Sequence, residues 1–393
     1  MCPAAASQRP WWVELGAVLP RSVTFARDAA RAGNAVPPLA ANPLAWATVA
    51  VDELAMSAAY LIGRRGGERV TDEMLAATAD AVARLRSAGV VDEPLLAHPS
   101  PGAPTEVRLS RRRRFGSDFE HLSYASGYVP AAGLTGAVEW DDEVANRTAH
   151  AYLLRADEQP RPWALVLHGH RMGEPRDLRL LGSLRLQHDL QVNVAHLVLP
   201  MHGPRGRDGG RPFPGVDPVR NFLGVSQAVW DARTLLGWLR AGGAETIGVF
   251  GVSLGGHVAA MLAGLDTALA GVVAGVPTAD LSTMLADTVR AHWGEEAVAA
   301  SHVLDDASRT LSRLASPLSF APRLPVDRRF LYAAVGDRLV TPQQALALWQ
   351  HWERPTILWL QGGHIANNVG ASRRFVSDAF IACGVAGVRA GAQ

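Results

Sequence analysis

The most constraining feature of the sequence is a short apolar run that leads directly into a G-x-S-x-G motif. The run covers residues 246–250, the motif is centred on Ser253, and residues 258–263 continue as an apolar helical pattern. A serine between a strand and a helix occupies a sharp turn that exposes its hydroxyl above a sheet. Gly251 and Gly255 keep the flanking positions small enough for this turn to close. We therefore predict that Ser253 is a nucleophile, the alternative being a glycine-rich helix start with a structural serine.

Further short apolar runs predict the other strands of the same sheet. Several contain no polar side chain, which is typical of strands buried on both faces of a parallel sheet. Helical patterns separate most runs and predict right-handed crossovers in a doubly wound α/β sheet. The first two strands have no helix between them, so we expect an antiparallel start. The predicted strands are 121–129, 148–155, 163–167, 192–199, 246–250, 269–274, 329–335 and 356–360, and the helices are 176–188, 222–241, 255–265, 341–352 and 371–382.

Two regions fall outside this alternation. Residues 1–115 read as helices and loops, and we predict a helical N-terminal extension packed on an α/β domain of residues 116–393. Residues from about 280 to 322 form a helical insertion between the sixth and seventh strands, where a short loop would suffice. Its position above the carboxyl edge of the sheet predicts a lid, with helices at 281–290, 295–304 and 308–315.

Two charged segments of the N-terminal region have more than one interpretation. Asp52 and Glu53 interrupt an apolar helix predicted at 43–63, and charges at the centre of a membrane-spanning helix are very costly. We predict a helix packed on the protein, with a helix lying on a membrane surface as the alternative. Four consecutive arginines at 111–114 predict a solvated loop, with contact to phosphate or a lipid headgroup as the alternative.

A serine hydroxyl is a weak nucleophile until a base takes its proton, so a histidine is required. His364 follows the last predicted strand and two glycines, where such a base is expected. The base needs a carboxylate that fixes its tautomer, and Asp337 stands just past the preceding strand. The order Ser253, Asp337, His364 is that of the α/β-hydrolases. Asp280, after the sixth strand, is the alternative acid.

Backbone N–H groups near Ser253 are expected to stabilise an oxyanion. We predict one from Leu254, at the start of the elbow helix, and one from His170, in the loop after the strand at 163–167. His168 is expected to orient that loop through hydrogen bonds. His202 and Arg205, after the next strand, are candidates for substrate contact or for bracing the site loops, and we favour bracing because proline and glycine dominate the segment.

Composition narrows the class of protein further. The chain of 393 residues has a formal net charge of +1, with arginine as its only basic residue apart from histidine, so charge gives no reason to expect a nucleic-acid partner. Cys2 and Cys383 form neither a disulfide framework nor a metal cluster, which favours a reducing compartment. The N-terminus has no secretory pattern. We expect a cytoplasmic protein without a transmembrane segment, for which peripheral membrane contact stays open.

Together these motifs resemble the α/β-hydrolase superfamily over residues 119–383. The His-Gly-Pro-Arg loop, the Gly-Val-Ser-Leu-Gly-Gly elbow and the long helical N-terminal region are similar to the group typified by α/β-hydrolase domain-containing protein 18. The resemblance implies an acyl-enzyme on Ser253, with His364 as base, Asp337 as its partner, and neither metal nor organic cofactor. Serine at this position argues against the dehalogenase and epoxide hydrolase chemistries of relatives with an aspartate nucleophile.

The substrate class is less constrained. Apolar side chains of the predicted lid favour an apolar acyl ester, either small or lipid, although the same side chains would equally pack the lid on the body. Esterase or lipase-like activity is therefore the first expectation. Acyltransferase, thioesterase and peptidase activities remain open, as does a non-catalytic protein that binds lipid or a partner. The apolar lid residues are Leu281, Met284, Leu285, Val289 and Trp293.

Overall fold

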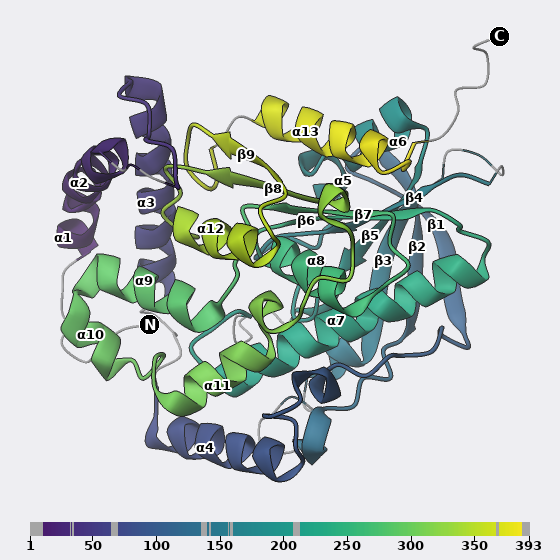
Figure 1. Ribbon diagram of the computed structural model, residues 1–393, viewed down its shortest axis with the longest axis horizontal. Coiled ribbons are helices and arrows are strands. Elements are labelled where there is room, and N and C mark those ends of the chain that lie inside the picture. The colour runs from purple at the N-terminus through teal and green to yellow at the C-terminus, as the bar shows by residue number, and fades with distance from the viewer. Residues whose placement is uncertain are drawn as a thin grey trace.

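A computed structural model describes residues 11–31, 33, 35–63, 70–134, 140, 143–155, 157, 160–206, 213–366 and 369–386. Cys2 and the N-terminal ten residues lie outside this part of the chain. The described residues form a nine-stranded sheet in the order β1-β2-β3-β5-β4-β6-β7-β8-β9 (Figure 1). The strands are β1 (Val107–Arg114), β2 (Ser117–Ala125), β3 (Thr148–Leu154), β4 (Trp163–Leu167), β5 (Asn193–Val198), β6 (Ile247–Val252), β7 (Gly271–Gly275), β8 (Arg329–Ala334) and β9 (Thr356–Leu360).

The sheet divides into an antiparallel and a parallel part. The strands β1, β2, β3 and β5 pair antiparallel in that order, whereas every pairing from β5 through β4 to β9 is parallel. The expected antiparallel start and the mostly parallel remainder are both confirmed. All residues of β4, β5, β7 and β8 are buried. This burial explains why β4 and β7 carry no polar side chain, whereas β5 includes Asn193 and His196 and β8 begins with Arg329.

Helices cover both faces of the sheet (Figure 1). One hydrophobic core joins the sheet to α4, α7, α8, α11 and α12, and a second joins its other face to α6 and α13. The long helix α7 begins at an N-cap, Asp217, whose carboxylate accepts the N–H groups of Val219 and Arg220. The bounds are α4 (Asp72–Ser87), α5 (Asp177–Leu180), α6 (Ser183–Leu190), α7 (Pro218–Ala241), α8 (Leu254–Leu265), α11 (Asp306–Leu314), α12 (Pro342–His351) and α13 (Val369–Ala382).

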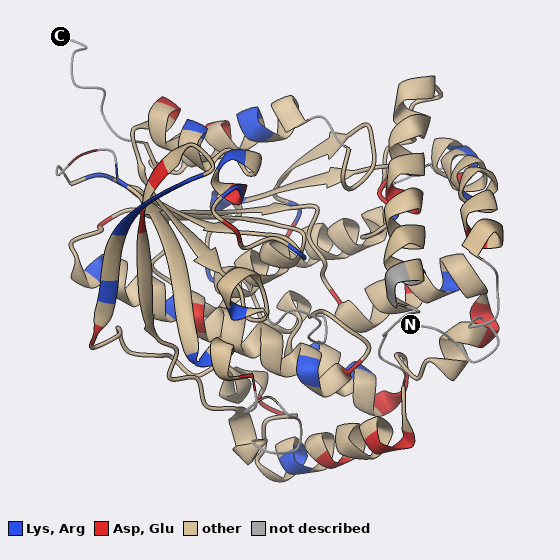
Figure 2. Cartoon of the chain, turned by 180° about the vertical axis from the view of Figure 1, so that it is seen from behind, with Lys and Arg blue, Asp and Glu red and all other residues tan. Residues whose placement is uncertain are grey.

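The prediction of a solvated loop at residues 111–114 was wrong. These four arginines form the end of β1, which pairs with β2 in a register that sets Arg112 opposite Phe119. Figure 2 shows the arginines along this strand at the edge of the sheet. An edge strand lacks a second partner, and charged side chains on it hinder pairing with another chain. Because solvent reaches β1 so freely, its sequence lacks the alternation that marks a half-buried strand.

Three N-terminal helices stand beyond β9, at the opposite edge of the sheet from β1 (Figure 1). They are α1 (Trp11–Gly16), α2 (Val18–Arg31) and α3 (Pro43–Gly63). Ala45, Val49 and Met56 of α3 are buried, so the prediction that this helix packs on the protein is confirmed. Asp52 and Glu53, at its middle, are fully buried. None of the described helices combines the length and the apolarity that crossing a bilayer requires.

The insertion between β7 and β8 is helical, as predicted. It contains α9 (Leu281–Trp293) and α10 (Glu295–Ala300), followed by α11, which packs on α7. Helix α9 contacts both the N-terminal helices and the loop after β8. Its His292 Nε2 lies 3.8 Å from Glu53 Oε1, and its Asp287 accepts a hydrogen bond from Thr341 at 3.1 Å. The insertion therefore joins the N-terminal helices to the carboxyl edge of the sheet.

Candidate active site

Ser253 stands on the turn between β6 and α8. Its φ of 56° and ψ of −115° are rare for a residue with a side chain, and such strain persists only where the surroundings enforce it. Here two glycines allow the neighbouring backbone to pack closely enough to hold Ser253 in this conformation. A Cβ at Gly251 would lie 2.0 Å from the carbonyl oxygen of Gly255, and one at Gly255 would lie 2.1 Å from that of Leu167. The turn closes this tightly only because both positions lack a side chain.

A histidine from one loop contacts Ser253, and an aspartate from another loop contacts this histidine. His364 follows β9, and its Nε2 atom lies 3.1 Å from Ser253 Oγ. Asp337 follows β8, and its Oδ2 atom accepts a hydrogen bond from His364 Nδ1 at 2.7 Å. The strands β6, β8 and β9 run parallel within one sheet, so their carboxyl ends share an edge. This shared edge brings together three residues that are far apart in the sequence.

The environment of Asp337 fixes the histidine tautomer. Asp337 is 1% exposed, and its second oxygen, Oδ1, accepts the N–H groups of Leu339 at 2.9 Å and Val340 at 2.7 Å. Its Oδ2 atom is thereby directed at His364 Nδ1, which donates its hydrogen. The neutral ring then has an acceptor at Nε2, on the side of Ser253. Such an arrangement can remove the proton from a serine hydroxyl.

The electrostatics strengthen His364 as a base. Burial alone would lower the pKa of His364, because desolvation disfavours the imidazolium. The charge and the hydrogen bond of Asp337, together with the charge of Asp52, act in the opposite direction and raise the pKa above its usual value. A base with a raised pKa binds a proton more strongly during reaction.

The alternative acid, Asp280, has a different position. It is the N-cap of α9, where its Oδ1 atom accepts the N–H of Thr283 at 2.7 Å. Its Oδ2 atom accepts the hydroxyl of Ser312 at 2.8 Å, which ties α9 to α11. The structure therefore brings Asp337 against His364 and assigns the carboxylate of Asp280 to the insertion.

The two predicted oxyanion donors lie on segments that flank Ser253. Leu254 is the first residue of α8, so its N–H belongs to the set that has no acceptor within the helix. His170 lies in the loop after β4, which is close to the turn, since a Cβ on Gly169 would be 3.5 Å from Ser253 Cβ. The ring of His170 contacts the carbonyl oxygen of Phe213 at 3.0 Å through Nδ1. Both segments therefore lie next to the turn that carries Ser253.

His168 holds the same loop in place. It is fully buried, and its Nε2 atom accepts the N–H of Leu199 at 3.0 Å. The ring hydrogen must therefore be on Nδ1, which donates to the carbonyl oxygen of Gly169 at 2.8 Å. Burial, together with the neighbouring His196, lowers the pKa of His168 to about 3. This histidine thus stays neutral and connects the loop after β4 to the end of β5.

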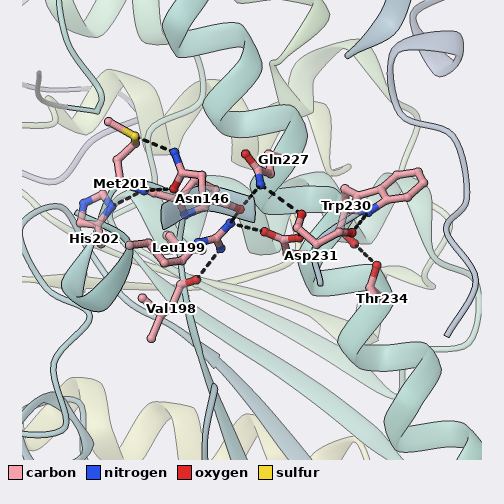
Figure 3. A network of polar contacts seen from close by, with 12 residues as sticks. Asn146, Val198, Leu199, Met201, His202, Gln227, Trp230, Asp231 and Thr234 are labelled. Carbon is pink, nitrogen blue, oxygen red and sulfur yellow. Dashed lines mark hydrogen bonds and ion pairs between the residues drawn. The ribbon is translucent and has the colours of Figure 1, made fainter. Parts of the chain in front are cut away.

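His202 and Arg205 lie behind these loops. Arg205 is fully buried and donates to the carbonyl oxygens of Val198 and Asn146, each at 3.0 Å, while pairing with Asp231 at 2.8 Å. Figure 3 shows the polar network around Asn146 and Asp231 to which these contacts belong. His202 is also buried and contacts the carbonyl oxygen of Pro200 at 2.8 Å. Arg205 thus connects the end of β5 with the segment before β3 and with α7, whereas the hydrogen-bonding contact of His202 lies within its own loop.

A cavity of about 180 Å³ opens beside His364, between the α5–α6 segment and α13. Most of its wall is apolar. The polar part includes Arg185, which pairs with Asp189, and Arg373, which donates to the carbonyl oxygen of Leu180 at 2.9 Å. Apolar lining residues include Leu180, Leu181, Leu186, Phe250, Val252 and Ile365.

Asp52 is a site residue that the sequence did not reveal as one. Its carboxylate accepts the backbone N–H groups of His364 at 2.5 Å and of Ile365 at 3.0 Å. The one signal in the sequence is a pair of acidic residues in the middle of an apolar helix, and this pattern by itself indicates only an obstacle to membrane insertion. In the described part of the chain, no group of three or more His, Cys, Asp or Glu side chains is arranged to hold a metal ion.

Comparison with known proteins adds to this geometry. No family model matches the chain. Two curated Mycobacterium tuberculosis sequences, "Uncharacterized protein Rv2627c" of strain H37Rv and "Uncharacterized protein MT2702" of strain CDC 1551, are each 40% identical to it over 273 residues. The matches cover 68% of this chain and 64% of each relative, so the chain spans less than two thirds of their length.

Solved structures resemble the chain in fold. Acetyl xylan esterase 1 from Thermoanaerobacterium sp. has a TM-score of 0.50 at 15% identity, over 79% of this chain and 94% of its own. The fold is that of the α/β-hydrolases. An acetyl xylan esterase from Paenibacillus sp. R4 has a TM-score of 0.48 at 16% identity, over 79% of this chain and 95% of its own.

Proposed function

We propose that this chain is a serine hydrolase that cleaves carboxylic ester bonds through an acyl-enzyme on Ser253. The observation that carries the proposal is the continuous line of contacts from Ser253 Oγ to His364 Nε2 at 3.1 Å and from His364 Nδ1 to Asp337 Oδ2 at 2.7 Å. The strained backbone of Ser253 supports it, because strain of this kind is concentrated at functional sites.

In this mechanism His364 removes the hydroxyl proton while Ser253 Oγ forms a bond to the ester carbonyl carbon. The N–H groups of Leu254 and His170 would stabilise the negative oxygen of the tetrahedral intermediate. Collapse of the intermediate breaks the bond to the alcohol, which leaves with the proton from His364. Water then attacks the acyl-enzyme with His364 again as base, and the acid is released with Ser253 restored.

The cavity beside His364 favours an ester with an apolar acyl or alcohol group. Its wall is mostly apolar and reaches Val252 and Ile365, the neighbours of Ser253 and His364. A pocket of this character suits a hydrocarbon group while its few polar side chains set orientation. We take a small or lipid acyl ester as the substrate class.

The experiment treats the protein with a fluorophosphonate probe and assays p-nitrophenyl esters of increasing chain length. Wild type should be labelled and should hydrolyse the esters, whereas Ser253→Ala should do neither. Ser123→Ala, on β2, is the matched control and should behave as wild type. An unlabelled wild type, or equal labelling of Ser253→Ala, would refute the nucleophile. Labelling without ester hydrolysis would support the nucleophile but contradict the ester substrate, and would favour thioester, peptide or acyl-acceptor substrates.

The cavity has its own test in the chain-length profile. Leu180 lines the cavity and is 59% exposed, so Leu180→Trp should fold and narrow the space. We expect the preferred ester to become shorter, while Leu95→Trp, at an exposed position outside the cavity lining, leaves the profile unchanged. An unaltered chain-length profile for Leu180→Trp would show that the substrate does not bind in this cavity.

A further inference from the structure

A single buried carboxylate on α3 joins the loops that carry Asp337 and His364. Asp52 Oδ2 accepts the N–H of His364 at 2.5 Å and the N–H of Arg338 at 3.1 Å, while Oδ1 accepts the N–H of Ile365 at 3.0 Å. Asp52 is fully buried, so water does not replace these bonds. A carboxylate with three backbone donors fixes the relative position of both loops, because charge-assisted bonds are stronger than neutral ones.

The glycines of the two loops admit α3 to this position. A Cβ at Gly363 would lie 2.6 Å from Asp52 Oδ2 and 2.7 Å from the carbonyl oxygen of Thr48. A Cβ at Gly336 would lie 3.0 Å from a methyl group of Val49. Side chains at either position would push the helix away from the loops. Gly363, directly before His364, therefore serves the contact with α3.

The neighbouring residue, Glu53, anchors the helix on the other side of the same loop. Its Oε2 atom accepts a hydrogen bond from Arg338 Nε at 2.9 Å, and its Oε1 atom pairs with Arg21 of α2. The guanidinium of Arg338 also lies over the ring of Phe25, 4.4 Å from its centroid. Asp52 and Glu53 thus contact the backbone and the side chain of one residue, which leaves α3 little freedom to shift relative to Asp337.

From these contacts we infer that Asp52 is a positioning residue for His364, and that the N-terminal helices are part of the active site. The inference rests on the proposed function, in which His364 is the base. Asp52 acts through the backbone of His364 and Ile365, and its negative charge also acts on the imidazole of His364. It thereby sets the direction of Nε2 toward Ser253 and stabilises the imidazolium that forms when the hydroxyl proton is removed.

The groups that face His364 define the expected pH dependence. They are Asp337, from the loop after β8, and Asp52, from α3, and the charge of each raises the pKa of His364. Asp52→Asn retains an oxygen acceptor and the side-chain size but removes the charge. The pKa of His364 should therefore fall, and the acidic limb of the kcat/KM profile should move to lower pH. A loss of loop order alone would lower the plateau without moving that limb.

The test measures kcat, KM and the pH profile of p-nitrophenyl ester hydrolysis for wild type, Asp52→Asn and Asp52→Ala. We expect the plateau of kcat/KM to fall about tenfold to a hundredfold, mainly through kcat, with Asp52→Asn the milder change. Glu53→Gln is the matched control, since it removes a buried charge from the same helix without contacting the backbone of His364. It should lower stability while leaving the acidic limb in place.

An NMR titration of the His364 imidazole in wild type and in Asp52→Asn separates this inference from the proposed function. It needs no turnover, so it gives a result even if the protein hydrolyses no ester. A lower pKa of His364 in Asp52→Asn supports the inference. An unchanged pKa together with an unchanged plateau overturns it, as does an equal displacement of the limb in Glu53→Gln. If the fluorophosphonate probe fails to label wild type, the proposed function fails independently.

Discussion

The two edges of the sheet use charge in opposite ways. At the β1 edge, Arg113 and Asp118 lie 3.7 Å apart with their side chains 75% and 78% exposed. Beyond β9, Glu53 is fully buried and pairs with Arg338 and Arg21, whose side chains are 9% and 16% exposed. Water screens the Arg113–Asp118 pair, so it contributes about 0–1 kcal/mol to the free energy of unfolding. The set around Glu53 is desolvated, so each charge depends on its partner.

The density of charge in the sequence is therefore a poor guide to how much the charged side chains contribute to the folded structure. Four consecutive arginines lie exposed on an edge strand, where charged side chains hinder pairing with another chain. Two acidic residues in an apolar helix hold together the loops of the candidate active site. Four measurements test whether the two edges differ in this way.

The largest effect is expected for Asp337→Asn, near the covered edge. Without the carboxylate, His364 loses its fixed tautomer and the charge that stabilises its imidazolium, so kcat should fall by about 10,000-fold. Asp118→Asn, at the β1 edge, should leave kcat unchanged. Steady-state kinetics on p-nitrophenyl acetate measures both, and a similar small effect for the two variants would contradict the contrast.

A large loss of stability is expected for Glu53→Ala. The substitution leaves Arg21 and Arg338 without their shared carboxylate in a desolvated setting, and the free energy of unfolding should fall by about 3–5 kcal/mol. Urea unfolding followed by circular dichroism measures the change. A loss below about 1 kcal/mol would mean that solvent reaches this network as freely as it reaches β1.

The third prediction concerns the pH dependence of stability. Burial, and then the charge of Asp337, raise the pKa of Asp52 from its usual 3.8 to about 6. The folded protein therefore holds this proton more tightly than the unfolded chain, and the resulting stabilisation is complete below pH 3.8 and lost as pH rises through 6. Relative to Asp52→Asn, wild type should lose about 3 kcal/mol over that window. Urea titrations at several pH values measure this, and a constant difference would refute it.

The smallest effect is expected for Arg113→Ala at the β1 edge. Its partner is exposed and distant, so the free energy of unfolding should change by no more than about 0.5 kcal/mol. Thermal unfolding at low and high salt provides the measurement. A loss above about 1 kcal/mol that disappears in high salt would show that the β1 edge does depend on its charges.

The parts of the fold that the sequence predicted are those with local physical signals. The turn at Ser253 needs small neighbours, so glycines mark it, and buried parallel strands need uninterrupted apolar runs. The positions of Asp337 and His364 follow once the strand order is assumed, because each stands directly after a strand. The contacts of His364 with Ser253 and of Asp337 with His364 are consistent with that expectation.

The remaining features depend on contacts between distant segments. Strand β1 has arginines where a core-facing strand would carry apolar residues, since it lies at an exposed edge. Asp52 contacts the backbone of His364, 312 residues away, and such backbone contacts place no demand on the partner's side chain. No pattern within α3 indicates which loop its acidic residues meet. Only the assembled structure supplies that information.

The long separation between Asp52 and His364 has a consequence for biosynthesis. The ribosome releases Asp52 and Glu53 early, and their partners after β8 and β9 emerge last, 312 residues later for the N–H of His364. At about 5–20 residues per second, Asp52 waits about 15–60 s for the backbone N–H of His364, whereas Glu53 can pair with Arg21 of α2 from the start. Until those donors appear, water molecules hydrogen-bond the carboxylate of Asp52. Translation that stops after β9 but before residue 364 leaves a chain that contains every described strand and Ser253 but lacks His364.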